Sequence, residues 1–132
     1  MTNRINRVLC DADFLIALYV DKDSNHQQAQ EIYAEYTNFN ILNITFYEVA
    51  TVLSRLFDHQ LAKETLRDMK ELFTNVIIFD QGLEDKTYEI YYSYNKKNIS
   101  FFDCACLVTA QKHGYKIASF DKFYPKEILV KI

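Results

Sequence analysis

The chain has 132 residues, of which 49% are hydrophobic and 25% are charged, and this composition is typical of a folded globular protein rather than a disordered one. The net charge of -3 excludes a nucleic-acid binder that works by overall positive charge, although it is compatible with a local basic surface. Two glycines and one proline are too few for a sandwich or barrel with many tight turns, so long helices are favoured. No linker or repeat divides the sequence, and residues 1–132 are expected to form a single domain.

The sequence also indicates where the protein works. The longest apolar runs, such as residues 14–20, are far shorter than the roughly 18 residues of a membrane-spanning helix. The N-terminus lacks the apolar stretch of a secretory signal. Three cysteines, Cys10, Cys104 and Cys106, are an odd number without metal-site spacing, so free thiols are predicted. We therefore expect a cytoplasmic protein that does not enter a membrane.

Predicted strands and helices alternate along the chain. In order, the apolar periodicity predicts a strand at 7–10, helices at 13–20 and 24–36, a strand at 40–44, helices at 45–57 and 61–73, a strand at 76–79, helices at 83–95 and 100–113, a strand at 116–120 and a weaker strand at 128–132. Strands separated by helices indicate an α/β fold with a mostly parallel central sheet flanked by helices on both faces.

Several helix ends carry recognisable capping signals. Capping boxes begin at Ser24 and at Thr45, each with a Gln or Glu three residues later. Ser100 is predicted to open the last long helix and Gly114 to end it. Asp80 follows a strand-like run and is interpreted as the N-cap of the next helix rather than as a ligand.

Four acidic residues occupy positions where a parallel sheet gathers its ligands. Asp11 follows the first predicted strand and Asp121 follows the fourth, while Glu48 and Asp103 lie in first turns of predicted helices. Ligands of such sheets bind outside the carboxyl ends of the strands. If the first and fourth strands are neighbours, these four carboxylates are expected to converge.

Each of these acids also has a purely structural interpretation. Glu48 and Asp103 have the spacing of capping-box acids, and Asp121 is suited to start a turn. One shared site is the more economical explanation. Clustered carboxylates raise one another's pKa, which a divalent cation reverses, and ligands that are all oxygen favour Mg²⁺ or Mn²⁺. Such an ion suits phosphodiester hydrolysis, because it activates water and orients phosphate oxygens.

The segments VLCDADFLIALY, NITFYEVATVLSR, ISFFDCACLVTAQKHG and IASFDKF resemble, in this order, the four motif blocks of the PIN domain. The resemblance covers residues 8 to about 123, and the chain length is similar to that of VapC-type toxins. It implies a PIN-like, Rossmann-like parallel sheet of about five strands and a metal-dependent endoribonuclease that uses Mg²⁺ or Mn²⁺. It also implies an RNA substrate, a homodimer and a cognate antitoxin protein.

The same resemblance implies roles for individual residues. Asp11, Glu48, Asp103 and Asp121 match the catalytic acids, with Asp11 and Asp103 as core metal ligands and with Asp121 and Glu48 completing the pocket directly or through water. Asp13 replaces the usual Ser, Thr or Asn. It is either a fifth carboxylate for the metal or a helix cap, and the cap is favoured.

Ser119 stands where Thr is commoner in the family, and it keeps the hydroxyl group. Together with Ser119, the candidates for RNA contact are the basic residues Arg7 and Lys122 and, further, Arg4, Lys96, Lys97, Lys112 and Lys116. An ordinary solvated surface is the alternative for each. Candidates for a dimer face or antitoxin groove are Phe46, Tyr47, Phe57, Tyr91, Tyr92 and Tyr94, and burial in the core is expected for about half of them.

Three other functions are weighed against this one. VLCDADF also resembles the start of a haloacid-dehalogenase-type phosphatase, but the later G-D-x-x-x-D motif is missing. A phosphoreceiver domain would use Asp80, and it would explain neither Glu48 nor Asp103. A PIN-like fold kept only as a non-catalytic binding module is the third alternative.

Overall fold

The computed structural model describes residues 4–131, including the side chains of residues 7–131. In chain order its elements are β1 (Arg4–Cys10), α1 (Ala12–Tyr19), α2 (His26–Glu35), β2 (Tyr36–Leu42), α3 (Asn43–Leu56), α4 (His59–Leu72), β3 (Val76–Ile77), α5 (Gln81–Ser93), α6 (Phe101–His113), β4 (Lys116–Ala118) and the short 3-10 helix η1 (Lys126–Ile128). The predicted alternation of strands and helices is confirmed.

The strands of the described chain form one parallel sheet in the order β3-β2-β1-β4. Strand β1 lies between β2 and β4, and its residues Val8, Leu9 and Cys10 have no exposed surface. Complete burial is expected for a parallel strand that is covered on both faces. The predicted α/β fold is therefore confirmed, with a described sheet of four strands rather than about five.

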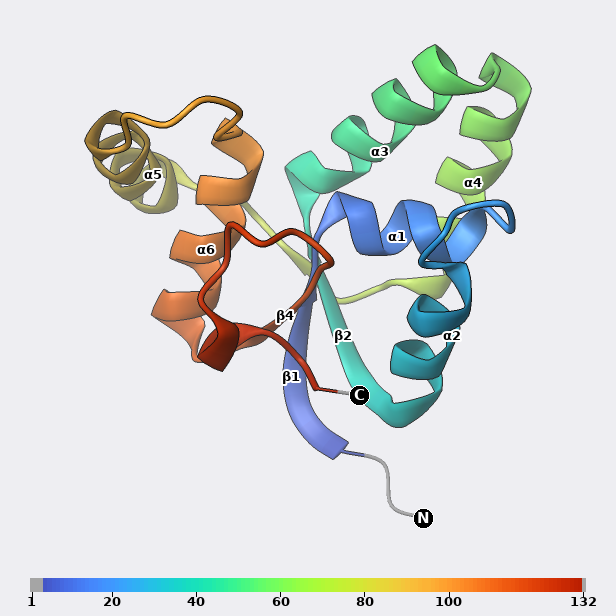
Figure 1. The fold of residues 1–132 in the computed structure, drawn as a ribbon, viewed down its shortest axis with the longest axis horizontal. Helices are drawn as coiled ribbons and strands as arrows, with labels where there is room; N and C mark the ends of the chain where they lie inside the picture. Colours follow the sequence, from blue (N-terminus) through green and yellow to red (C-terminus); the bar gives the residue numbers. More distant parts are fainter. Residues whose placement is uncertain (1–3, 132) are drawn as a thin grey trace.

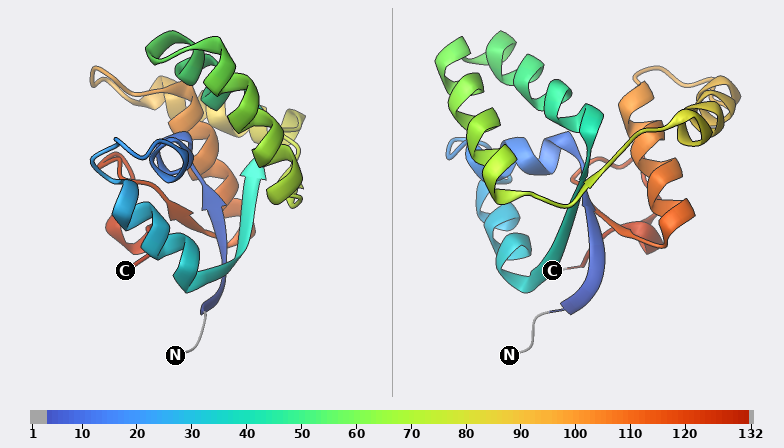
Figure 2. Two further views of the ribbon diagram at one scale, coloured as in Figure 1. Left: turned by 90° about the vertical axis from the view of Figure 1, so that its right-hand side faces the viewer. Right: turned by 180° about the vertical axis from the view of Figure 1, so that it is seen from behind.

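Helices cover both faces of the sheet, as Figures 1 and 2 show. Val8 and Cys10 pack into a core with residues of α1 to α4, whereas Leu9 packs into a second core with residues of α5 and α6. This alternation follows from the two-residue period of a strand, which points successive side chains to opposite faces. The two cores therefore meet at β1, and the end of β1 lies between them.

The starts of α2 and α3 differ from the prediction. Helix α2 begins at His26, after Asn25, which makes no side-chain cap hydrogen bond, so the capping box at Ser24 is wrong. The ring of His26 contacts the Ala17 carbonyl oxygen at 2.7 Å. Helix α3 begins at Asn43, whose Oδ1 accepts a 2.9 Å hydrogen bond from the N–H of Phe79. Thr45 is buried inside the first turn of α3, so it is not the cap. At both helix starts, the side chain of the first helical residue contacts another segment of the chain.

Strand β2 also begins earlier than predicted. It starts at Tyr36, directly after α2, and Tyr36 pairs with Arg4 of β1. The predicted strand at 40–44 therefore ends too late, because residues 43 and 44 already belong to α3. Pairing with β1 extends β2 over residues 36–39, which the apolar pattern does not assign to a strand.

The predicted fifth strand is reduced to one bridge. Leu129 pairs in parallel with Ile117, and the N–H of Val130 donates to the Ile117 carbonyl oxygen at 3.0 Å. Residues 126–128 form η1 instead, and residue 132 lies outside the described part of the chain. The last segment therefore adds to the edge of the sheet without forming a strand among the described residues.

Three predicted helix ends are confirmed. Asp80 caps α5 by accepting a 3.0 Å hydrogen bond from the N–H of Leu83. Ser100 caps α6 by accepting one from the N–H of Phe102 at 3.0 Å. Gly114 ends α6 in the left-handed region with φ 73°, where the missing Cβ avoids strain. None of the helices in the described part of the chain is both long and apolar enough to cross a membrane.

Candidate active site

The pairing of β1 with β4 brings two distant parts of the chain together. Cys10 is in register with Ala118, and the N–H of Asp11 donates to the Ala118 carbonyl oxygen at 3.1 Å. Asp11 directly follows Cys10, and Ser119 directly follows Ala118, so Asp11 and Ser119 lie side by side at the carboxyl end of the sheet. The condition for convergence of the four acids, that the first and fourth strands are neighbours, is therefore met.

Asp11 has two roles in this position. It is 2% exposed, and its Oδ1 accepts a 2.7 Å hydrogen bond from the N–H of Ala12, which caps α1. Its Oδ2 accepts hydrogen bonds from Ser119 Oγ at 3.2 Å and from the Tyr124 hydroxyl at 2.9 Å. Burial is the main reason that the pKa of Asp11 is raised, and these donors oppose that shift.

Asp13 joins Asp11 rather than capping the helix. The cap of α1 is Asp11, so the favoured interpretation of Asp13 as a helix cap is wrong. Asp13 accepts hydrogen bonds from Ser119 Oγ at 3.0 Å and from the N–H of Phe120 at 3.0 Å. Burial, followed by the charge of Asp11, raises the pKa of Asp13 to about 7. Asp13 is therefore a further carboxylate of the cluster.

Ser119 joins three segments of this cluster. Its hydroxyl lies within 3.2 Å of oxygens of both Asp11 and Asp13, and it accepts a 3.0 Å hydrogen bond from the N–H of Asp121. A hydroxyl has one proton, so it serves only one carboxylate at a time. Ser119 is 8% exposed and thus orders the acids, while its contact with RNA stays a prediction.

Tyr124 is the site residue that the sequence analysis missed. It is 3% exposed, and its hydroxyl lies 2.9 Å from Asp11 Oδ2 and 3.5 Å from Asp103 Oδ1. Burial, together with the negative groups around it, raises the pKa of Tyr124, so the phenol keeps its proton and acts as a donor. No periodicity or motif marks this position, because its role depends only on how residues 119–125 fold back over the acids.

Glu48 faces the cluster from α3. It lies in the second turn of the helix, so the capping-box interpretation is wrong. Its Oε1 is buried and has no hydrogen-bond partner among the described residues. Burial, and then the charges of Asp11 and Asp13, raise the pKa of Glu48 to about 8. An orphaned buried carboxylate oxygen is costly unless a proton or a cation compensates it.

Asp103 and Asp121 complete the cluster. Asp103 lies in the first turn of α6, and burial followed by the charges of Asp11 and Asp121 raises its pKa to about 8. A hydrogen bond between the carboxyl groups of Asp103 and Asp121 adds to this rise. Asp121 also accepts a 3.0 Å hydrogen bond from the N–H of Phe123, so it starts a turn and faces the cluster at once. All four predicted acids, together with Asp13, are thus brought together.

The cluster offers mainly oxygen atoms to a ligand. The Cys106 thiol lies 3.9 Å from Asp11 Oδ1, but burial raises its pKa well above the ordinary value, so it stays neutral. The three cysteines are buried and free, as predicted. Carboxylate and hydroxyl oxygens fit a hard divalent ion. Among the described side chains, no three His, Cys, Asp or Glu already surround one point as metal ligands.

Two of the predicted basic residues contact groups outside the acid cluster. The Arg7 guanidinium packs 6.0 Å from the centre of the Tyr115 ring, and Lys116 donates to the Glu127 carbonyl oxygen. Lys122 is exposed in the turn after Asp121. Contact of Lys122 or Arg7 with RNA stays a prediction, and the side chain of Arg4 lies outside the described part of the chain.

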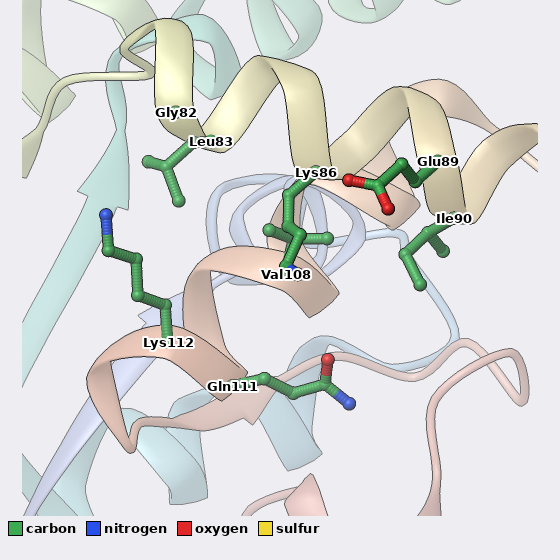
Figure 3. A pocket seen from close by; sticks show the side chains of 8 residues that line it. All are labelled: Gly82, Leu83, Lys86, Glu89, Ile90, Val108, Gln111 and Lys112. Atoms are coloured by element: carbon green, nitrogen blue, oxygen red, sulfur yellow. The ribbon is translucent and has the colours of Figure 1, made fainter.

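A large cavity of about 520 Å³ lies elsewhere, between α5 and α6. Figure 3 shows Leu83, Lys86 and Ile90 extending from α5 towards Val108 and Lys112 of α6. None of the clustered acids lines this cavity. The acid cluster is therefore a separate feature at the carboxyl edge of the sheet.

The predicted aromatic candidates are mostly exposed. Of the six, Phe46 is in the core, whereas Tyr47, Phe57, Tyr91, Tyr92 and Tyr94 are exposed. Core burial thus explains fewer of them than expected. The exposed rings are available for contacts with other molecules.

A parallel sheet flanked by helices, with buried carboxylates gathered beyond the ends of β1 and β4, defines an α/β protein with an acidic site at the carboxyl edge. The sequence model of the PIN domain matches residues 8–126. The chain therefore belongs to the PIN domain family. No curated protein sequence matches closely enough to refine this assignment.

Solved structures with the same fold include several toxins. The VapC20 toxin of Mycobacterium tuberculosis, which cleaves the sarcin-ricin loop, matches with a TM-score of 0.80 and 22% identity over 95% of this chain and 98% of that chain. A toxin–antitoxin complex from Klebsiella pneumoniae matches with a TM-score of 0.64 and 23% identity over 94% and 96% of the two chains. VapBC2 from Rickettsia felis, bound to a DNA fragment from its promoter, has a TM-score of 0.66, 14% identity and 92% coverage of both chains.

Proposed function

We propose that this chain is a metal-dependent endoribonuclease that hydrolyses RNA phosphodiester bonds, and that it is the toxin of a VapBC-type toxin–antitoxin pair. The observation that carries the proposal is the buried acid cluster. Its members Asp13, Glu48 and Asp103 have pKa values raised to about 7 or 8, first by burial and then by the charge of Asp11. This mutual destabilisation is relieved by a divalent cation.

The residues of the cluster fit Mg²⁺ or Mn²⁺. Asp11, Asp103 and Asp121 would hold the ion, with Glu48 and Asp13 completing the set directly or through water. A bound ion of this kind polarises a phosphate oxygen and lowers the pKa of water. The buried Oε1 of Glu48 has no hydrogen-bond partner among the described residues, and once its carboxyl group is ionised it would be suited to accept a proton from a water molecule beside the phosphate. Ser119 and Tyr124 orient Asp11 through their hydroxyl groups.

The proposed partners follow from the same assignment. Structures with this fold include toxin–antitoxin complexes, which supports a cognate antitoxin protein as the partner. An acidic cluster suits a basic side chain inserted by such a protein. We also propose a homodimer that acts on RNA in the cytoplasm.

The structure fits a phosphoreceiver domain less well than it fits a nuclease. Asp80, the acceptor that it needs, caps α5 after the edge strand β3. It does not contribute to the raised pKa values of the acid cluster. The phosphatase alternative and the non-catalytic module are separated from the nuclease by the following assay.

The test is cleavage of labelled RNA by the purified protein, with Mg²⁺ or Mn²⁺ and with EDTA. We expect cleavage only with the metal, and we expect Asp11→Asn and Asp103→Asn to lose about 100-fold or more of the rate. Asp80→Asn is the matched control, because Asn also caps helices and this residue lies outside the cluster. Circular dichroism checks that every variant is folded. Undiminished activity of Asp11→Asn would refute the assignment. Absence of metal-dependent cleavage in the wild type would leave the phosphatase and the binding module, which phosphate transfer to an aspartate then separates.

A further inference from the structure

Exposed tyrosine rings gather at the end of α5 and in the segment that follows it. Tyr88, Tyr91, Tyr92 and Tyr94 are 42%, 39%, 74% and 37% exposed. We call these four residues the aromatic platform. Isolated exposed rings are normal on a protein surface, whereas a contiguous group of them marks a contact site.

The rings of the platform are held in place by one another and by α6. Tyr88 stacks on Tyr92 with ring centres 5.9 Å apart. Phe101, at the start of α6, lies 5.1 Å from the Tyr88 ring and 5.6 Å from the Tyr91 ring. Rings fixed in this way lose little conformational entropy when another planar group packs against them.

A hollow in the platform is lined by both aromatic and basic side chains. Its volume is about 230 Å³, and its lining includes Tyr91, Tyr92, Tyr94, Lys96 and Ile99. This is the space of seven or eight water molecules at about 30 Å³ each, which is the scale of one planar base. Lys97 follows Lys96 and is also exposed. Rings combined with ammonium groups suit a ligand that has both flat faces and negative charge.

The platform is continuous with the acid cluster. The Tyr94 ring lies 5.3 Å from the Phe123 ring, and Phe123 lies 5.1 Å from the Tyr124 ring, whose hydroxyl bonds to Asp11 at 2.9 Å. A second connection runs through Phe101, which precedes Asp103 by two positions in α6. Ring contacts therefore connect the tyrosines to a residue that bonds Asp11, and an RNA strand that occupied both places would run from the platform towards the acid cluster.

We propose that the aromatic platform binds the bases of single-stranded RNA next to the cleavage site. This inference rests on the proposed ribonuclease function and adds a subsite to it. Base stacking on exposed rings is the usual way to bind single strands, because every base offers a flat face. Paired bases expose no such faces, so a duplex is a poor ligand. Continuity with the acids and the adjoining Lys96 favour RNA over a second copy of this chain.

The expected salt dependence is shallow. Lys96 and Lys97 are the cations beside the platform, whereas α5 contributes the acids Glu84, Asp85 and Glu89 and one further cation, Lys86. With about two phosphates neutralised, the slope of log affinity against log salt is about -1.4 for a single strand. Ring stacking, rather than charge, therefore supplies most of the binding.

Binding is tested in an Asp11→Asn background, so that the RNA stays intact. The probe is an oligouridylate of about eight nucleotides, compared with the same strand in a duplex. The chain has no tryptophan, so Tyr92→Trp adds a single indole ring. Stacking of a base on this ring is expected to quench its tryptophan fluorescence. We expect Tyr92→Ala and Tyr94→Ala each to weaken binding about tenfold. Tyr92→Phe keeps the ring and is expected to bind as before.

Phe57→Ala is the control for loss of an exposed ring elsewhere. Phe57 is 49% exposed. It directly follows the C-terminus of α3, whereas Glu48 lies near the N-terminus of the same helix. It should leave binding unchanged. Equal affinity of Tyr92→Ala and Phe57→Ala for the oligouridylate would overturn the inference, as would equal affinity for the strand and the duplex.

Cleavage and oligomeric state separate the remaining outcomes. If the wild type cleaves RNA and the tyrosine variants cleave it equally well, the proposed role of the aromatic platform is wrong and the ribonuclease assignment stands. If the wild type never cleaves RNA but the tyrosine variants still lose binding, the ribonuclease assignment fails alone. If light scattering shows that Tyr92→Ala converts a dimer into a monomer without a change in RNA affinity, the platform is a dimer face and the inference is overturned.

Discussion

The hydroxyl group of Tyr124 donates a 2.9 Å hydrogen bond to Asp11, which lies 113 positions earlier in the chain. The same hydroxyl is 3.5 Å from Asp103. Tyr124 thus lies between the two carboxylates proposed as the core metal ligands, and it reaches them from the segment that follows β4. Its single proton stabilises Asp11 more than Asp103, because the shorter contact is to Asp11.

Removal of this hydroxyl is expected to destabilise the protein. Tyr124→Phe keeps the buried ring but leaves Asp11 without one of its donors, and a hydrogen bond to a charged group contributes about 1.5–3 kcal/mol. We expect the free energy of unfolding at neutral pH to fall by that amount in urea denaturation.

The control for this variant is Tyr92→Phe, which removes a hydroxyl from an exposed ring. Its free energy of unfolding should stay within about 0.5 kcal/mol of the wild type. If Tyr124→Phe is as stable as this control, the hydroxyl of Tyr124 does not hold the acids.

The raised pKa values predict that stability falls as pH rises. Asp13, Glu48 and Asp103 have pKa values of about 7, 8 and 8 in the folded protein, whereas unfolded carboxyl groups titrate near pH 4. Between these values the folded state binds more protons than the unfolded state, so each extra proton makes the free energy of unfolding fall by about 1.4 kcal/mol per pH unit. Urea denaturation from pH 5 to pH 9 without metal should show this decline. A flat profile would contradict the raised pKa values.

Divalent ions are expected to reverse this effect. Mn²⁺ at about 100 times its Kd should raise Tm by about 10 °C, because it binds only the folded protein. The rise should be larger at pH 8 than at pH 6, since protons compete for the same carboxylates. Asp103→Asn should lose most of it, whereas Asp80→Asn should keep it. An equal rise in both variants would place the ion outside the acid cluster.

Local signals were sufficient to predict several parts of this structure. Asp80, Ser100 and Gly114 mark helix ends that depend on contacts within a few residues, and the structure has all three. The signals at Ser24 and Thr45 are of the same kind, but contacts from other segments move those helix starts. A capping motif therefore predicts a helix end only where no tertiary contact competes with it.

The acid cluster was predictable because strand ends converge in a parallel sheet. That rule places Asp11 and Asp121 at one edge without any knowledge of side-chain positions. The rule does not predict the positions of Asp13 or Tyr124 in the cluster, because these depend on hydrogen bonds between segments more than 100 positions apart. Such contacts leave no periodic trace in the sequence, so only the folded structure reveals them.

Glu48→Gln separates the stability of the cluster from its function. The buried Oε1 of Glu48 has no hydrogen-bond partner within the described part of the chain. Its pKa is raised to about 8, so the side chain is charged at pH 9 and neutral at pH 5. Gln removes that charge with little change in shape. We therefore expect the free energy of unfolding to rise by about 1 kcal/mol at pH 9 and to change little at pH 5. Cleavage of RNA should fall at the same time, because the proposed proton acceptor is lost. An equal loss of stability at both pH values would instead indicate that Glu48 acts through packing, and a variant that cleaves RNA at the wild-type rate would remove Glu48 from the proposed mechanism.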